Sequence, residues 1–134
     1  MKNFLAIVSL CLFLNDNANA EWSFLENLEN GSKFYTDIKT LKKDSGYIYI
    51  WTMTDLKEGM IGGDKEGIRA IFSYKEFKKI DCKLNRIENV QYIFYTGQMG
   101  TGKAKPFQRE KQKWLYPPPG SSMGEFGRIL CENY

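Results

Sequence analysis

Apolar and polar residues alternate from Phe72 to Leu84, in the segment FSYKEFKKIDCKL. Read at a period of two residues, one side of this segment is apolar and carries a thiol: Phe72, Tyr74, Ile80, Cys82 and Leu84. The other side is charged, with Phe77 as the exception. Because side chains alternate between the two faces of a sheet, the pattern predicts a half-buried strand with Cys82 on its inner face.

Towards the C-terminus the apolar spacing becomes that of a helix. A rigid proline-rich lead-in, 117–120, is followed by Ser122 and Glu125, which have the spacing of a capping box. At about 100° per residue, an apolar stripe then runs along one side, with Cys131 at its edge: Met123, Phe126, Leu130 and Tyr134. Gly124 and Gly127 weaken the helix, so we expect packing and a covalent link to hold it.

Five further segments have the composition of strands: Trp22–Leu28, a segment beginning at Phe34, Tyr47–Met53, Ile87–Thr96 and Lys103–Arg109. Aromatic and β-branched residues are densest in Tyr47–Met53, which is therefore predicted to be central. Asp37–Lys43 is predicted to be a turn or helical bend, and the glycine-rich Asp55–Gly67 a mobile loop. The resulting fold class is α+β: a single antiparallel β-sheet with a C-terminal α-helix.

The first twenty residues are predicted to be a signal peptide. Lys2 supplies the positive charge, Phe4–Leu14 is an apolar core too short to span a bilayer, and Ala18-Asn19-Ala20 is a cleavage site. Residues 21–134 then form one exported domain. No later apolar run is long enough for a membrane span, so no transmembrane segment is expected in the mature chain.

Export decides how the cysteines are interpreted. Of the three, Cys11 lies inside the signal, which leaves Cys82 and Cys131 in a compartment where disulfides persist. We therefore predict a disulfide that ties the helix to the sheet and stabilises the fold by about 4 kcal/mol. Lipidation of Cys11 is the alternative, but Leu10 stands where a lipobox needs a small residue.

Charge and composition exclude several functions. The net charge of +3 is only mildly basic, and because the protein is exported we expect no nucleic-acid partner. The chain has no histidine, which removes the usual zinc sites and histidine-based catalytic arrangements. Two acidic pairs, Asp55 with Glu58 and Asp64 with Glu66, could run glycoside hydrolysis only if a cleft fixed them. We expect no catalytic residue, metal or cofactor.

Positive charge gathers in one segment, where it is interleaved with Phe107. Its candidate ligand-binding residues are Lys103, Lys105, Arg109, Lys111, Lys113 and Trp114. One interpretation is a docking surface for sulfated glycans or for an acidic segment of a host protein. The other is an edge strand whose lysines prevent sheet-to-sheet aggregation. The same choice arises for Lys75, Lys78, Lys79 and Lys83, where a solvated face is favoured.

The loop from Gly97 to Lys103 has the Gly-x4-Gly-Lys core of a phosphate-binding loop. It lacks the hydroxyl needed for Mg²⁺, because residue 104 is Ala, and Pro106 prevents the helix that should follow. A glycine-rich hairpin loop is the preferred interpretation.

The order of several short motifs resembles the bacterial surface-adhesin protein E family over nearly the whole mature chain. These motifs are Trp22, Phe34-Tyr35-Thr36-Asp37, Tyr49-Ile50-Trp51, Ser73, Ile80-Asp81-Cys82, Phe94-Tyr95, Gly100-Thr101-Gly102, Pro119-Gly120-Ser121 and Leu130-Cys131. The resemblance implies the same sheet, helix and disulfide. It also implies an adhesin that binds host extracellular-matrix or serum proteins, such as vitronectin and laminin, by surface contact.

Two questions about location and partners stay open at the level of sequence. The best-known family members are lipoproteins, and the poor lipobox here leaves either the cell surface or the periplasm of a Gram-negative bacterium. A soluble periplasmic structural or assembly factor without a host ligand is therefore the alternative function. Exposed aromatic residues could also form a homodimer seam.

Overall fold

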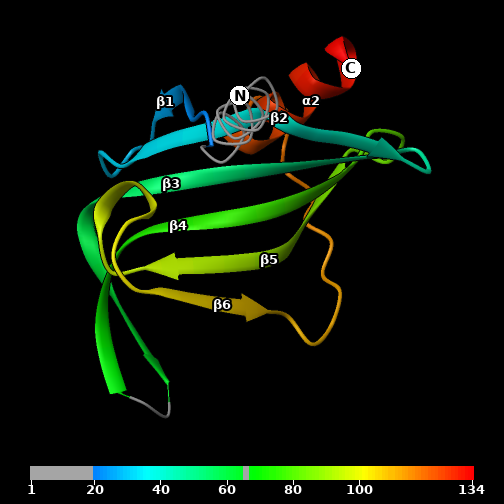
Figure 1. Cartoon of the computed structure of the whole chain (residues 1–134). Coiled ribbons are helices and arrows are strands. Elements are labelled where there is room, and N and C mark those ends of the chain that lie inside the picture. The colour runs from blue at the N-terminus through cyan, green and yellow to red at the C-terminus, as the bar shows by residue number, and fades with distance from the viewer. Residues whose placement is uncertain (1–19, 65–66) are drawn as a thin grey trace, which may run out of the picture.

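The computed structural model describes residues 20–64 and 67–134 of the chain. The predicted signal peptide, including Cys11, lies outside this described part except for Ala20. The elements are β1 (Ser23–Asn27), β2 (Lys33–Asp44), β3 (Tyr47–Asp64), β4 (Gly67–Asp81), β5 (Arg86–Tyr95), the 3-10 turn η1 (Gln98–Gly100), β6 (Ala104–Gln108) and α2 (Ser122–Asn133). The predicted fold class is confirmed (Figure 1).

The six strands form one antiparallel sheet in which the order across the sheet is the order along the chain. Each strand pairs with its sequence neighbours, so β1 and β6 are the two edges. The far ends of β3 and β4 project from the sheet as a hairpin arm, residues 60–64 and 67–71 (Figure 1).

The prediction of a mobile loop over Asp55–Gly67 is wrong for its described residues, because 55–64 continue β3 and Gly67 begins β4, while 65 and 66 lie outside the described part. The strand register shifts between Asp55 and Met60, after which Met60 pairs with Ile71. Gly59 lies in the shifted stretch, where an added Cβ would come within 2.8 Å of the Phe72 ring. The glycine therefore marks a bulge with a close contact, not a break in the strand.

Asp37–Lys43 is likewise part of a strand, β2, and not a turn. The register with β3 shifts between Asp37 and Lys42, and the Thr40 side chain substitutes for the missing ladder bonds. Its hydroxyl accepts a hydrogen bond from the Trp51 N–H (3.0 Å) and donates one to the Asp37 carbonyl (2.6 Å).

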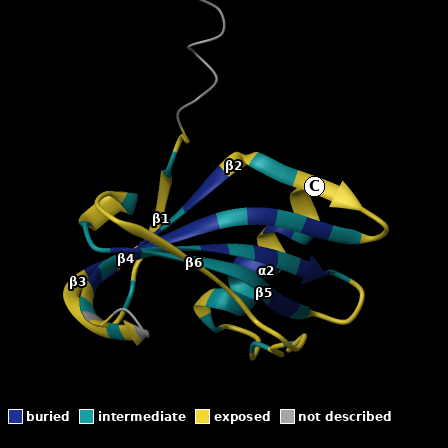
Figure 2. Cartoon of the chain, turned by 60° about the horizontal axis from the view of Figure 1, so that its bottom comes forward, coloured by how far each residue is buried: buried dark blue, intermediate teal, exposed yellow. Residues whose placement is uncertain are grey.

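Helix α2 covers part of one face of the sheet, and the core lies between them. Phe126 and Leu130 of α2 pack on buried residues of β2 to β5: Phe34, Ile48, Ile50, Ile80 and Ile87. Gly127 allows the close approach, since a Cβ there would lie 3.4 Å from the Ile87 side chain. The central strands are accordingly buried where α2 lies against them (Figure 2).

The helix begins one residue earlier than the capping box predicts. Ser121 is the N-cap, and its hydroxyl accepts a hydrogen bond from the Gly124 N–H at 3.2 Å. Of the predicted apolar stripe, Phe126 and Leu130 are buried, whereas Tyr134 at the C-terminus is exposed.

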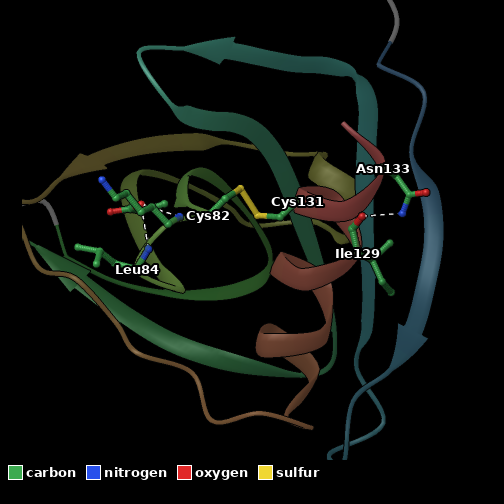
Figure 3. Close-up of a disulfide and its surroundings, with 7 residues drawn as sticks. Cys82, Leu84, Ile129, Cys131 and Asn133 are labelled. Carbon is green, nitrogen blue, oxygen red and sulfur yellow. Dashed lines mark hydrogen bonds between the residues drawn. A yellow bond between two sulfur atoms is a disulfide. The ribbon is translucent and has the colours of Figure 1, made fainter.

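The predicted Cys82–Cys131 disulfide is confirmed, but Cys82 lies in the turn after β4 and not in the strand (Figure 3). The Cα atoms of the two cysteines are 5.7 Å apart. Asp81 ends the strand because its carboxylate accepts the N–H groups of Lys83 and Leu84 at 3.1 and 3.3 Å. The turn directs Leu84 away from the core, and it is 54% exposed, so its predicted inward position is wrong.

Candidate binding surface at the open edge of the sheet

Beyond the area covered by α2, the same sheet face carries four aromatic side chains from β4, β5 and β6. Strand register places Tyr74 opposite Phe94, and Tyr92 opposite Phe107. The Tyr92 and Phe94 rings are parallel, with centroids 5.8 Å apart, and Tyr74 and Phe107 lie 6.0 and 6.3 Å from their neighbours. We call these four residues the aromatic trough. Burial raises the pKa of Tyr74, whereas Phe107 is 53% exposed.

The hairpin arm and β6 enclose a cavity of about 190 Å³ beside the trough. Its lining is mostly apolar: Met60, Gly62, Gly63, Gly67, Arg69 and Ile71 from the arm, and Phe94, Lys105, Pro106 and Phe107 from β5 and β6. This volume is that of a recess of side-chain size.

The structure divides the predicted ligand-binding residues between two faces. Lys105 lies opposite Phe94 on the trough side, and Arg109 contacts the Tyr92 ring with its guanidinium 5.7 Å from the centroid. Arg109 also donates a hydrogen bond to the Tyr92 hydroxyl (3.4 Å), which raises the pKa of the guanidinium. Lys103 lies directly before β6 and, at the two-residue period of a strand, belongs to the same side.

The other three predicted residues follow β6 in the loop that leads to α2. Lys111 and Lys113 are exposed. Trp114 is half-buried on the opposite, helix-free face, where it stacks on Tyr47 (6.1 Å) and contacts Arg86 (4.0 Å). Its position follows from the bridge that Leu115 makes with β5, which holds this part of the loop against the sheet.

The outer side of β6 is an open sheet edge, and its sequence limits pairing there. The Thr96 N–H donates to the Lys103 carbonyl at 3.1 Å, which makes this a hydrogen-bonded pair. Since antiparallel strands alternate, Ala104, Pro106 and Gln108 direct their backbone groups outward. Pro106 has no N–H, so the edge lacks a donor at its centre, as expected of a protected edge strand.

The prediction of a solvated lysine face is wrong for Lys78, which is 1% exposed. Its ammonium lies 3.3 Å from the Glu76 carboxylate and donates a hydrogen bond to the Asn89 side chain at 2.8 Å. Burial lowers the pKa of Lys78 despite the opposing effect of Glu76. The signal was present in the sequence, because a period of two from Phe72 places residues 76 and 78 on the inner face.

Lys75 and Lys79 lie on the helix-free face and contact aromatic rings. The Lys79 ammonium is 4.2 Å from the Tyr47 ring centroid, and that of Lys75 is 5.0 Å from Tyr95. These contacts hold half-buried cations over a layer of packed rings, to which Tyr49 and Phe77 also contribute. The layer explains why Phe77 breaks the charged side of the alternation.

The glycine-rich loop is a hairpin loop whose backbone donors are already engaged. The Met99 N–H donates to the Asp55 carboxylate at 2.7 Å, and the Gly100 N–H to the Ser73 hydroxyl at 2.9 Å. Ser73 in turn donates to the Gly97 carbonyl at 2.6 Å. A phosphate would have to break these bonds, so the loop is not a phosphate cradle, and Asp55 serves a structural role.

The described residues, 20–64 and 67–134, contain neither a membrane-spanning helix nor a cluster of metal-binding side chains. No helix there is both long enough and apolar enough to span a bilayer. No three acidic, cysteine or histidine side chains there gather closely enough to hold a metal ion.

Comparison with known proteins connects this architecture to one family. A family model described as surface-adhesin protein E matches residues 22–132. Among curated proteins, no sequence matches the chain.

Solved structures of Haemophilus influenzae protein E share the fold. One has a TM-score of 0.66 and 19% sequence identity, with 87% of this chain and 89% of that chain covered. Protein E from a non-typeable strain gives a TM-score of 0.66 at 18% identity, with coverage of 87% and 80%.

Proposed function

The chain belongs to the surface-adhesin protein E family, and we propose that it is an exported bacterial envelope protein that binds host extracellular-matrix or serum proteins by surface contact. The observation that carries the proposal is the basic edge of the sheet. There Lys103, Lys105 and Arg109 flank the exposed Phe107 and the half-buried rings of the trough on a face that α2 leaves open. A noncatalytic contact surface requires this combination of charge for attraction and apolar area for affinity.

Replacing Lys103, Lys105, Lys111 and Lys113 together with Ala tests this proposal. Affinity for immobilised vitronectin or laminin should fall about tenfold, and the dependence of the dissociation constant on salt should become flatter. Surface plasmon resonance between about 50 and 300 mM NaCl measures both quantities.

A matched control removes the same charge elsewhere. Lys33, Lys42, Lys43 and Lys57 are exposed on β2 and β3, and their replacement with Ala should leave affinity unchanged. Equal losses in the two variants would indicate a nonspecific effect of net charge. An unchanged affinity in the first variant would place the binding site elsewhere.

The proposed location has its own test. Protease treatment of intact cells should remove the protein while periplasmic markers survive. Full protection would favour the alternative of a periplasmic structural or assembly factor, for which host binding would no longer be the function.

A further inference from the structure

We propose that the aromatic trough and the hairpin arm form a groove for an extended acidic peptide that inserts one bulky apolar side chain. This inference names the chemistry of the partner and therefore rests on the proposed function. It goes beyond that function because it specifies a peptide segment as the ligand and one recess as the binding site. The helix-free face, on which Trp114 lies, is not part of this site.

The first support is an open backbone edge beside the recess. β5 pairs with β4 only as far as Ser73 and Tyr95, so in the described part of the arm residues 67–71 pair with β3 alone. The arm lies against β6 across the cavity, as the shared lining shows. An extended peptide in this groove can therefore add backbone hydrogen bonds along the arm, which the outer edge of β6 is poorly suited to do because of Pro106.

The second support is the size and chemistry of the recess. Its volume of about 190 Å³ exceeds the roughly 150 Å³ that accommodates benzene in an apolar cavity. Met60, Ile71, Phe94 and Phe107 supply apolar walls. A single Phe or Leu side chain matches this space and is the kind of anchor that dominates peptide interfaces.

The third support is the charge around the recess. Lys105 and Arg69 line the cavity itself, and Arg109 lies over the adjoining Tyr92 ring. Lys103 precedes them on the same side of β6. Glu76, an inward carboxylate of β4, is buried beside Lys78. Acidic residues on either side of the apolar anchor complement the groove.

A peptide fits these features better than a sulfated glycan does. A glycan would satisfy the cations, but it has no bulky apolar side chain for the recess and no strand backbone for the arm. The glycan therefore becomes an outcome of the test.

The direct test uses a fluorescein-labelled peptide of about ten residues, in which Glu alternates with Val around one central Phe. Fluorescence anisotropy with the full mature protein should show saturable binding that weakens as salt is added. A peptide with Ala in place of the central Phe should bind about tenfold more weakly. A peptide with Lys in place of Glu should not bind.

Two protein variants locate the contact. Phe107→Ala should weaken peptide binding about tenfold, whereas Phe24→Ala, which removes an equally exposed ring from the opposite edge of the sheet, should not. Lys105→Glu should also weaken peptide binding, and the loss of affinity should be larger at low salt than at high salt. Circular dichroism confirms that each variant is folded.

The outcomes separate this inference from the proposed function. If heparin competes with host-protein binding but the acidic peptide does not, the inference is overturned and the proposed function is unaffected. Peptide binding that is unaffected by Phe107→Ala overturns the groove. Failure of both host proteins and peptides to bind overturns both proposals.

Discussion

The two halves of one sheet face differ in what covers them. Under α2, Phe126 is 9% exposed and packs in a continuous apolar core that the disulfide closes at one end. Over β5 and β6, Phe107 is 53% exposed, and its described neighbours include the Tyr92 ring and residues of the arm. The strands are continuous across both halves, so the difference arises from the short α2, whose 12 residues reach only part of the face (Figure 2).

This division assigns stability and recognition to different places. Apolar area that has been removed from water under α2 stabilises the fold, whereas area left exposed over β6 is available to a partner. The same type of substitution should therefore lower the free energy of unfolding in the covered half and lower the affinity for a partner in the open half. The following predictions test that contrast, beginning with the largest expected effect.

Removing the disulfide should destabilise the covered half most. Cys82→Ser with Cys131→Ser opens a loop closed over a sequence separation of 49 residues, which should lower the free energy of unfolding by about 4 kcal/mol. Urea unfolding followed by circular dichroism measures the change. The reduced wild-type protein should unfold at the same urea concentration as the double variant, and unchanged stability would contradict the structural role of the bond.

Matched Phe→Ala substitutions compare the two halves directly. Phe126→Ala removes a ring that packs edge-on to Phe34, with centroids 5.6 Å apart, and should cost about 3–4 kcal/mol. Phe107→Ala should change the free energy of unfolding by less than about 0.5 kcal/mol. Equal losses would show that the trough is part of the core and not a surface held open for binding.

The Asp81 carboxylate should give the covered half an acid-sensitive component of stability. Burial raises the pKa of this carboxyl, but hydrogen bonds from Arg86, at 2.8 Å, and from the backbone N–H groups of Leu84 and Lys83 outweigh burial. They hold the pKa below its ordinary 3.8. The folded state then binds fewer protons than the unfolded state, so the contribution is complete above pH 3.8 and is lost as pH falls through the lower, folded-state pKa.

Asp81→Asn isolates this contribution, because the amide oxygen can still accept backbone N–H groups. The variant should be less stable than the wild type at pH 7, and the difference should shrink as the pH falls below 3.8 and through the folded-state pKa. Urea midpoints of both proteins across this range provide the measurement. A difference that persists at low pH would mean that side-chain shape, and not charge, is responsible.

The covered half could be predicted from sequence because its features follow either from local spacing patterns or from the single pairing open to its two cysteines. The alternation around Ile80 and the helical spacing of Phe126 and Leu130 identify the two packed surfaces. Once the signal is set aside, the two remaining cysteines can pair only with each other. The position of Cys82 differs from the prediction, because the carboxylate cap of Asp81 ends the strand at Asp81 and not at the predicted Leu84.

The open half was harder to predict because its form depends on pairing between distant residues. Gly62 and Gly63 suggested a loop, but their cross-strand partners in 67–71 extend the hairpin. The basic residues were recognised, yet the separation of Arg109 from Trp114 onto opposite faces depends on a bridge to β5 that has no local signal. The charge of Lys78 predicts exposure to solvent, whereas its place in the two-residue alternation from Phe72 predicts burial. The structure follows the alternation.

The sequential strand order has a consequence for how the chain matures. Since every strand pairs with neighbours in the sequence, a chain that emerges N-terminus first can complete each hairpin before the next strand arrives. Cys131, in contrast, lies in α2, which follows all six described strands in the sequence, so it becomes available after Cys82 and after those strands. A truncated or stalled chain would thus keep Cys82 as a free thiol, and alkylation of that thiol would count unfinished molecules in a population.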